Sequence, residues 1–176
     1  MFISKKNVYY LKGNQKKKRN NYIEEVKKME NYEVNLDTLA IIPLNANETR
    51  IVEKNDEFIV NSSSMKIIDD GCRYFGSTYS GRMEGTKSMI GINYKAPIIV
   101  EESTPMIFFP TISPRLEACS WISFKNIEKC IKKDKKSIII FKNGLELEID
   151  LSYKILQNQI LRSSYLNSML ISRKIA

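Results

Sequence analysis

Short runs of apolar residues separated by polar ones dominate the chain, and the clearest pair predicts a β-hairpin near its C-terminal end. Ser137–Phe141 is a run of apolar residues, and Leu145–Ile149 alternates apolar residues with acidic ones. This period of two places the apolar residues on one face of a strand and the acidic residues on the other. Between the two runs, Asn143 and Gly144 favour a type I′ turn because both tolerate a positive φ. We expect the first strand, which is apolar throughout, to be more central in its sheet.

Further short apolar segments predict more β-strands. Arg50–Glu53 and Phe58–Val60 flank four polar residues and therefore predict a second hairpin. The other expected strands are Thr38–Ile42, Met65–Ile68, Lys95–Val100, Met106–Phe109 and Cys119–Phe124. Several of them stop at or near a proline, which cannot donate to a β-ladder.

The pattern becomes helical after Asp150. Apolar residues then recur in steps of three and four, which predicts a helix with one face on the core. This stripe consists of Tyr153, Leu156, Ile160, Ser163, Leu166 and Leu170. Asp150 or Ser152 can cap the start of the helix. A shorter pattern of the same kind predicts an amphipathic helix around Asn20–Glu30.

These patterns predict an α+β protein. We expect a predominantly antiparallel β core with a C-terminal helix packed on it, and a helical, basic N-terminal extension. The extension is expected over residues 1–31 and a single domain over residues 32–176. No apolar run approaches ~18 residues, so no membrane span is predicted. The N-terminus lacks the apolar stretch and cleavage site of a signal peptide, so we expect a cytoplasmic protein.

Positive charge is concentrated at one end of the chain. The net charge is +8, and residues 1–31 hold nine Lys and Arg against three Asp and Glu. The body of the chain is therefore nearly neutral, although Gly71–Pro97 carries Arg73, Arg82, Lys87 and Lys95 against a single acidic residue. Between Cys72 and Lys87 these cations alternate with aromatic residues and glycines, a mixture typical of surfaces that approach nucleic acid.

Several kinds of chemistry find no support in the sequence. The chain has no histidine, which removes Ser–His–Asp and Cys–His catalysis. Cys72, Cys119 and Cys130 form no Cys-x-x-Cys pair and are expected to be reduced thiols, either buried or redox-active. The glycines of Gly81–Ser88 do not have the spacing of a phosphate-binding loop. We expect no cofactor and no metal, and the protein is predicted not to be an enzyme.

One family shares the order and spacing of the motifs in this chain. The motifs are Tyr32-Glu33-Val34-Asn35, Cys72-Arg73-Tyr74-Phe75-Gly76-Ser77 with Tyr79, Gly81-Arg82, Gly85-Thr86, Lys95-Ala96-Pro97-Ile98-Ile99-Val100, Phe108-Phe109-Pro110-Thr111, Cys119-Ser120-Trp121-Ile122-Ser123, and Asn158-Gln159 with Arg162. In these motifs residues 32–170 resemble ComK, the competence transcription factors of low-GC Gram-positive bacteria. The resemblance implies an activator of DNA-uptake genes that binds paired A/T-rich boxes, mainly through the minor groove. It further implies a homo-oligomer on double-stranded promoter DNA, RNA polymerase as a partner, and a location at the nucleoid.

Seven residues are candidates for DNA contact. The narrow minor groove of A/T-rich DNA attracts arginine, and Arg73, Arg82 and Arg115 are the candidates for insertion. Lys87 and Lys95 are candidates for phosphate contacts, which position a protein without reading sequence. Asn158 and Arg162 lie on the predicted C-terminal helix, where they either face DNA or form its solvated side. For each arginine the alternative is a surface side chain or an intramolecular salt bridge. The aromatic residues Tyr74, Phe75 and Tyr79 are expected to lie in the core rather than to stack on DNA.

Two features depart from the family pattern, and two other functions stay open. The basic extension is longer than expected, and the chain ends at Ala176 without the C-terminal tail through which some members are handed to an adaptor and a protease. Control by degradation is therefore not expected to follow from the resemblance. The alternatives are a protein-interaction module with a basic tail and a metal-dependent nuclease that combines the pairs Asp69-Asp70 and Glu101-Glu102 with Glu84 and Lys87. The simpler expectation for these acidic residues is that they are solvated at the surface. Because the sequence shows no helix–turn–helix pattern, minor-groove contact is preferred.

Overall fold

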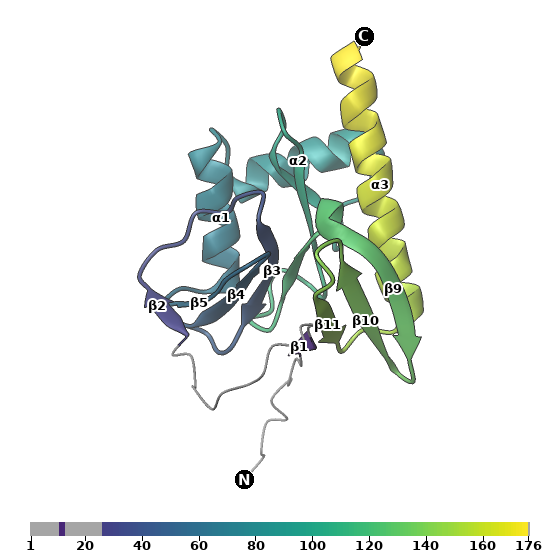
Figure 1. Ribbon diagram of the computed structural model, residues 1–176. Coiled ribbons are helices and arrows are strands. Elements are labelled where there is room, and N and C mark those ends of the chain that lie inside the picture. Colours follow the sequence, from purple (N-terminus) through teal and green to yellow (C-terminus); the bar gives the residue numbers. More distant parts are fainter. Residues whose placement is uncertain (1–10, 13–25, 176) are drawn as a thin grey trace.

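The computed structural model describes residues 11–12 and 26–175, and these residues form two β-sheets and three α-helices (Figure 1). The large sheet has seven strands, in the order β2 (Lys27–Met29), β5 (Glu57–Val60), β4 (Thr49–Glu53), β3 (Thr38–Pro43), β8 (Trp121–Ser123), β7 (Met106–Pro110) and β6 (Ile98–Glu101). Neighbouring strands are antiparallel except β2 and β5, which are parallel. The predicted hairpin of β4 and β5 is confirmed.

The small sheet has four antiparallel strands. Their order is β1 (Leu11–Lys12), β11 (Glu146–Ile149), β10 (Lys136–Phe141) and β9 (Ile127–Lys133). A single 3₁₀ turn, η1 (Phe124–Asn126), leads from β8 of the large sheet directly into β9 of the small one. The second predicted hairpin, β10 with β11, is confirmed, and β10 has a partner on each side.

The turn of that hairpin differs from the type I′ geometry predicted for it. Gly144 has a φ of 84°, but Asn143 is not among the described residues with a positive φ. The Gly144 N–H donates to the Phe141 carbonyl at 2.8 Å, and the Phe141 N–H donates to the Leu145 carbonyl at 2.9 Å. This is a three-residue loop in which only the glycine is left-handed. The prediction was wrong because two- and three-residue loops can share the same Asn-Gly pair.

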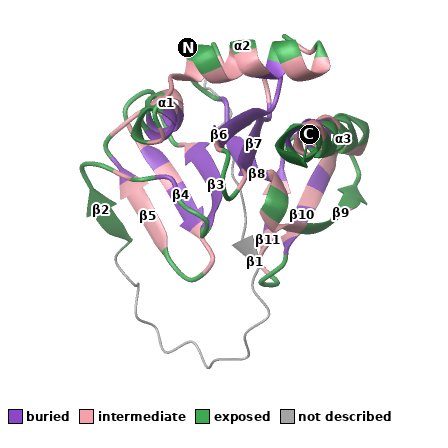
Figure 2. Cartoon of the chain, turned by 90° about the horizontal axis from the view of Figure 1, so that it is seen from above, coloured by how far each residue is buried: buried purple, intermediate pink, exposed green. Residues whose placement is uncertain are grey.

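The large sheet is covered on both faces. Ile41 of β3, Ile51 of β4 and Trp121 of β8 join the core formed with α1 (Ser64–Tyr74), and α2 (Tyr79–Ile90) adds Tyr79 and Met83 to it. Their neighbours along the strands turn to the other face and pack against the small sheet and α3 (Tyr153–Ile175). Figure 2 shows the buried strands of the large sheet, in purple, beneath α1 and α2. The predicted α+β class and the packed C-terminal helix are confirmed.

The two helices α1 and α2 are absent from the sequence prediction. Met65–Ile68, expected to be a strand, lies in α1, because the Ser63 hydroxyl caps the helix by accepting the Lys66 N–H at 3.3 Å. In α2, Thr86 is the buried residue, so this helix has no apolar stripe for a sequence pattern to reveal. The predicted helix around Asn20–Glu30 is wrong for Lys27–Met29, which form β2, and its residues 20–25 lie outside the described part.

The helix α3 follows its predicted stripe. Leu156, Ser163, Leu166 and Leu170 are buried. At its start the Ser152 hydroxyl accepts the Ile155 N–H at 3.4 Å, so Ser152 is the capping residue of the two that were predicted. Buried Gln159 lies on the same face and was not part of the predicted stripe.

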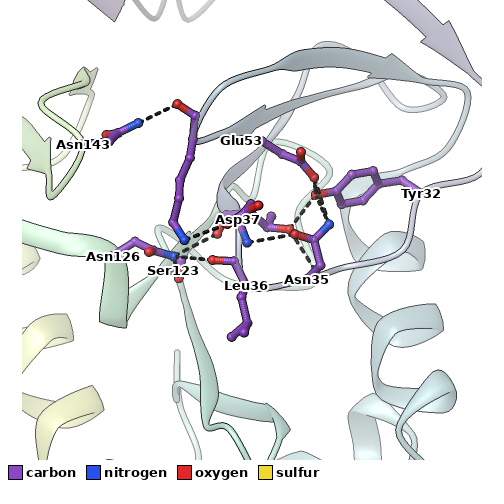
Figure 3. Close-up of polar contacts among 10 residues, drawn as sticks. Tyr32, Asn35, Leu36, Asp37, Glu53, Ser123, Asn126 and Asn143 are labelled. Carbon is purple, nitrogen blue, oxygen red and sulfur yellow. Dashed lines mark hydrogen bonds and ion pairs between the residues drawn. The ribbon is translucent and has the colours of Figure 1, made fainter.

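A network of polar side chains joins the two sheets around the loop before β3 (Figure 3). The Tyr32 hydroxyl donates to Glu53 of β4 at 2.5 Å, and the Asn35 amide donates to the same carboxylate at 2.9 Å. Burial and the bond to Glu53 raise the pKa of Tyr32. From the small-sheet side, Asn143 donates to the Lys54 carbonyl at 2.8 Å. The predicted boundary at residue 31 stays a prediction, and β1 and β2 on its N-terminal side pair with strands of the core.

Candidate nucleic-acid interface

A four-residue turn, Phe75–Thr78, joins α1 to α2. Gly76 has a φ of 78° in this turn, and the Thr78 hydroxyl caps α2. In Figure 2, α1 is seen nearly end-on while α2 lies lengthwise across the picture. Two helices joined by a short turn that contains glycine form a helix–turn–helix arrangement. Minor-groove contact was preferred partly because the sequence shows no helix–turn–helix pattern. The structure contains this arrangement, so that reason no longer holds.

Asp69 fixes the corner between these helices. One carboxylate oxygen accepts the Tyr79 N–H at 2.8 Å, and the other accepts Arg73 Nε at 2.7 Å. The bond from Tyr79, followed by that from Arg73, holds the pKa of Asp69 below its ordinary value. Arg73 stays exposed on the surface at the end of α1. It can therefore meet a phosphate while it remains bound to Asp69.

Arg82 has a different environment. Its side chain is 12% exposed and forms an ion pair with Glu102 in the turn between β6 and β7. Its Nη2 also donates to the Phe75 carbonyl at 3.2 Å. The side chain thus joins α2 to two other segments and is not free to enter a DNA groove in this conformation.

A groove of about 490 Å³ brings two of the predicted cations together. Its lining residues, which we call the α2 groove, are Met65, Tyr79, Met83, Asn93, Tyr94, Lys95, Ser113, Pro114 and Arg115. One wall comes from α1 and α2, and the others come from the loop before β6 and the loop between β7 and β8. Arg115 is exposed and forms no ion pair within the described part of the chain. Leu116 beside it is 55% exposed.

The helix α3 holds the loop that carries Lys95. Buried Gln159 donates to the Lys95 carbonyl at 3.1 Å and to the Pro110 carbonyl at 2.5 Å. One turn further on, Arg162 donates to the Tyr94 carbonyl at 3.1 Å. Lys95 itself has a φ of 48°, and its ammonium lies 5.3 Å from the centre of the Tyr94 ring. Asn158, which precedes Gln159, is exposed.

The predicted residues therefore fall into three places. Lys95 and Arg115 line the α2 groove, Arg162 of α3 binds the loop that carries Lys95, and Asn158 is exposed on α3. Arg73 lies in an adjacent hollow that shares Met65 and Tyr79 with the groove. Lys87 is exposed on α2 but does not line the groove.

Sequence analysis missed the capping role of Asp69 and did not name Tyr94 or Leu116 as functional candidates. Asp69 had been considered only as a surface acid or a metal ligand, and its capping role depends on the turn that brings Tyr79 back to it. Tyr94 and Leu116 are large apolar residues that remain 64% and 55% exposed. Sequence analysis could have found Tyr94 and Leu116 because each lies next to a candidate cation, Lys95 or Arg115, in a segment rich in proline and polar residues.

Hydrogen bonds and ion pairs with other groups of the protein occupy several of the acidic residues named for a nuclease centre. Asp69 binds Tyr79 and Arg73, and Asp70 binds Lys66. Glu101 accepts the N–H groups of its own turn, which lower the pKa of this carboxyl. Within residues 11–12 and 26–175, no three His, Cys, Asp or Glu side chains gather as metal ligands do.

The cysteines are free thiols. Cys72 of α1 and Cys119 are buried in the same core, and Cys130 of β9 is partly buried. Burial raises the pKa of each of these three thiols to about 11. A thiol with such a pKa is almost fully protonated at neutral pH. Cys72 and Cys119 are therefore buried, reduced thiols rather than redox-active ones.

In the described residues no helix has the length and apolarity needed to span a membrane. Comparison with known proteins gives two matches. Residues 29–175 match the family model described as ComK protein. The chain is also 36% identical over 145 residues to a protein named competence transcription factor from Bacillus subtilis (strain 168), and the match covers 80% of this chain and 75% of that protein. No solved structure matches.

Both matches cover most of the chain and agree with each other. The family match begins close to the end of the basic extension and includes every residue of the α2 groove. The matched family is one of transcription regulators, which confirms the prediction of a protein that is not an enzyme. The chain therefore belongs to the ComK family, and it is a competence transcription regulator.

Proposed function

We propose that the protein activates competence genes by binding A/T-rich boxes in double-stranded promoter DNA through the α2 groove and the two loops beside it. The observation that carries this proposal is the pairing of Lys95 and Arg115 across one groove. The protein acts in the cytoplasm, at the nucleoid. It binds paired boxes as a homo-oligomer and recruits RNA polymerase to them.

The loop between β7 and β8 suits the minor groove. Arg115 is exposed and has no ion-pair partner in the described residues, so its guanidinium can enter the negative potential of a narrow A/T tract. Leu116 is 55% exposed next to it. Minor-groove proteins often place an apolar side chain between base steps beside such an arginine. The pair therefore serves as the reading element.

Phosphate contacts surround this element. Lys95, Lys87 and Arg73 keep exposed or partly exposed cationic groups on the helices and loops around the groove. Arg162 and Asn158 extend this surface along α3. Arg82 is assigned a supporting role instead, because it is bound to Glu102 and to the Phe75 carbonyl.

Major-groove reading by α2 is the second candidate, and the helix–turn–helix arrangement favours it. The exposed residues of α2 are Ser80, Gly81, Glu84, Lys87 and Ser88. Glu84 can accept a hydrogen bond from cytosine, and Lys87 can donate to guanine. Such contacts would select G·C pairs rather than A/T-rich boxes, which is why minor-groove reading is preferred.

A gel-shift experiment with three duplexes tests the proposal. The first carries A/T boxes, the second is a G/C-rich control, and the third replaces A·T pairs by inosine–cytosine pairs, which look alike in the minor groove. We expect binding to the first and third duplexes at physiological salt and much weaker binding to the second. Loss of binding to the inosine duplex would assign reading to the major groove. Equal binding to all three would overturn sequence-selective recognition.

A further inference from the structure

A second groove, which shares no lining residue with the α2 groove, lies between β9 and α3. Its volume is about 690 Å³. The apolar part of its lining consists of Phe124, Ile127, Cys130, Tyr153, Ile160 and Leu161. Leu161 of α3 is 66% exposed, whereas Leu156 and Leu166 of the same helix are buried. Apolar side chains gathered in an open hollow are typical of a binding surface.

The rim of this groove is positively charged. Lys125, Lys129 and Lys142 line it, against the single acidic residue Glu128. None of these three lysines forms an ion pair with any described residue. The charge of the rim is therefore available to a ligand of opposite sign, and complementary charge favours the specificity and the rate of association of such a ligand.

The groove follows the outer edge of the small sheet. Ile127, Glu128, Lys129 and Cys130 are consecutive residues of β9, and all four line it. Side chains alternate between the faces of a strand, so a groove lined by four consecutive residues fits a position along the edge of the sheet. In the order β1-β11-β10-β9 this strand is the last, with β10 as its partner among the described strands. Edges of this kind accept peptide segments of other proteins.

Charge decides among the possible occupants. The N-terminal extension carries nine cations against three anions, so the basic rim repels it. A second copy paired along β9 would bring Lys129, Lys132 and Lys133 of both copies together, and like charges facing each other destabilise a strand pair. A DNA backbone would satisfy the lysines but would leave the apolar floor without a partner.

We propose that the groove between β9 and α3 binds an acidic peptide segment of another protein, one that carries large apolar side chains among its carboxylates. The apolar side chains fill the floor between Ile127, Ile160 and Leu161, and the carboxylates meet Lys125, Lys129 and Lys142. The surface is separate from the α2 groove, so the protein can hold such a partner while it is bound to DNA.

A labelled synthetic peptide provides the direct test. The probe repeats glutamate, leucine, glutamate and phenylalanine and carries fluorescein, and its binding to the full chain is followed by fluorescence anisotropy. Two control peptides of equal length carry alanine in place of the apolar residues or lysine in place of glutamate. We expect the probe to bind and both controls to bind at least about tenfold more weakly, which corresponds to about 1.4 kcal/mol. Equal binding of the alanine control would overturn the proposal, because charge alone would then explain it.

Two variants and a matched control locate the binding. Leu161→Asp and Lys129→Glu should each weaken the probe about tenfold, and both positions are exposed, so folding should be retained. Lys132→Glu makes the same charge change on the same strand but outside the groove, and it should have a much smaller effect. If Lys132→Glu weakens binding as much as Lys129→Glu, the groove is not the site.

Alkylation of Cys130 gives an independent readout. Cys130 lines the groove, whereas Cys72 and Cys119 are buried. In the folded protein iodoacetamide should therefore modify Cys130 first, and the probe peptide should slow that reaction. Protection by an A/T-box duplex instead of the peptide would show that the groove is part of the DNA surface. Protection that increases with protein concentration, together with a dimer in sedimentation, would show that a second copy occupies it. Either result overturns the proposal.

Discussion

At the scale of single residues, three arginines that looked equivalent in the sequence have three different environments. Arg73 is exposed and bound to Asp69, Arg82 is largely buried and bound to Glu102, and Arg115 is exposed without an ion pair in the described residues. Asp69 lies one helical turn from Arg73, so that pair could have been predicted once the helix was recognised. Glu102 lies twenty residues from Arg82 and reaches it only in the folded sheet, so no local pattern could reveal that pair.

Replacing Arg115 tests the reading element. Arg115→Ala should weaken specific binding to an A/T-box duplex by about 1–3 kcal/mol, because it removes the group assigned to the minor groove. The melting temperature should stay the same, since the side chain is exposed. A titration by gel shift measures the effect, and Arg173→Ala at the exposed end of α3 is the matched control. Identical titrations for the Arg115 variant and the unmodified protein would remove this residue from the interface.

Replacing Arg82 should affect folding before binding. Arg82→Ala leaves Glu102 and the Phe75 carbonyl without their partner, and it should lower the free energy of unfolding by about 1–3 kcal/mol. Urea denaturation followed by circular dichroism measures this change. A variant of unchanged stability that no longer binds DNA would return Arg82 to the set of DNA contacts.

At the scale of elements, strands were easier to predict than helices. Apart from β2, the strands of the large sheet contain short apolar runs next to prolines or polar turns, and β11 alternates apolar and acidic residues, so composition and period indicated most of the strands. The helix α2 buries little of its own surface and contains two glycines, so neither amphipathic pattern nor propensity indicates it. In α1, Gly71 packs so closely against Val34 that a Cβ at this position would lie only 3.0 Å from a Val34 methyl carbon. A side chain at this position would force Val34 to move, so a tertiary contact explains a glycine that argues against a helix.

The corner between α1 and α2 should make folding stability depend on pH. The pKa of Asp69 is lowered in the folded protein, so its carboxylate contributes stability that is complete above the ordinary value of 3.8 and is lost as the pH falls below it. Asp69→Asn should reduce stability at neutral pH, because the amide cannot accept both the Tyr79 N–H and Arg73. It should also reduce the loss of stability on acidification. Thermal unfolding from about pH 6 to about pH 3 measures both effects, and parallel curves for the two proteins would contradict the assignment.

At the scale of the whole molecule, the family could be identified from motifs, but the candidate site could not be assembled from them. The α2 groove takes residues from α1, from α2 and from two loops, and Gln159 of α3 fixes one of those loops. Sequence analysis therefore found Lys95, Arg115 and Arg162 as separate cations. It could not predict that Lys95 and Arg115 line one groove, or that Arg162 binds the loop that carries Lys95, because both depend on how distant segments pack in the folded protein.

The basic extension should add affinity without adding selectivity. Lys16, Lys17, Lys18 and Arg19 lie outside the described residues, and their replacement by glutamine removes four of the nine cations in residues 1–31. The variant should bind all duplexes more weakly, and its salt dependence should become shallower by up to about 0.9 per lost phosphate contact. The preference for A/T boxes over G/C-rich DNA should persist in binding titrations over a range of salt concentrations. Disappearance of that preference in a folded variant would place the reading element in the extension.

The only tryptophan of the chain gives the protein an internal optical reporter. Trp121 is fully buried, and the ring of Tyr79 meets it edge-to-face, with 5.8 Å between the ring centres. Tyr79 also lines both the α2 groove and the adjacent hollow of Arg73. A ligand that presses on Tyr79 must therefore disturb the surroundings of the indole, and the emission of Trp121 should change as DNA is added. Binding could then be followed in solution without any attached dye, because the Tyr79 ring contacts both the α2 groove and the buried indole.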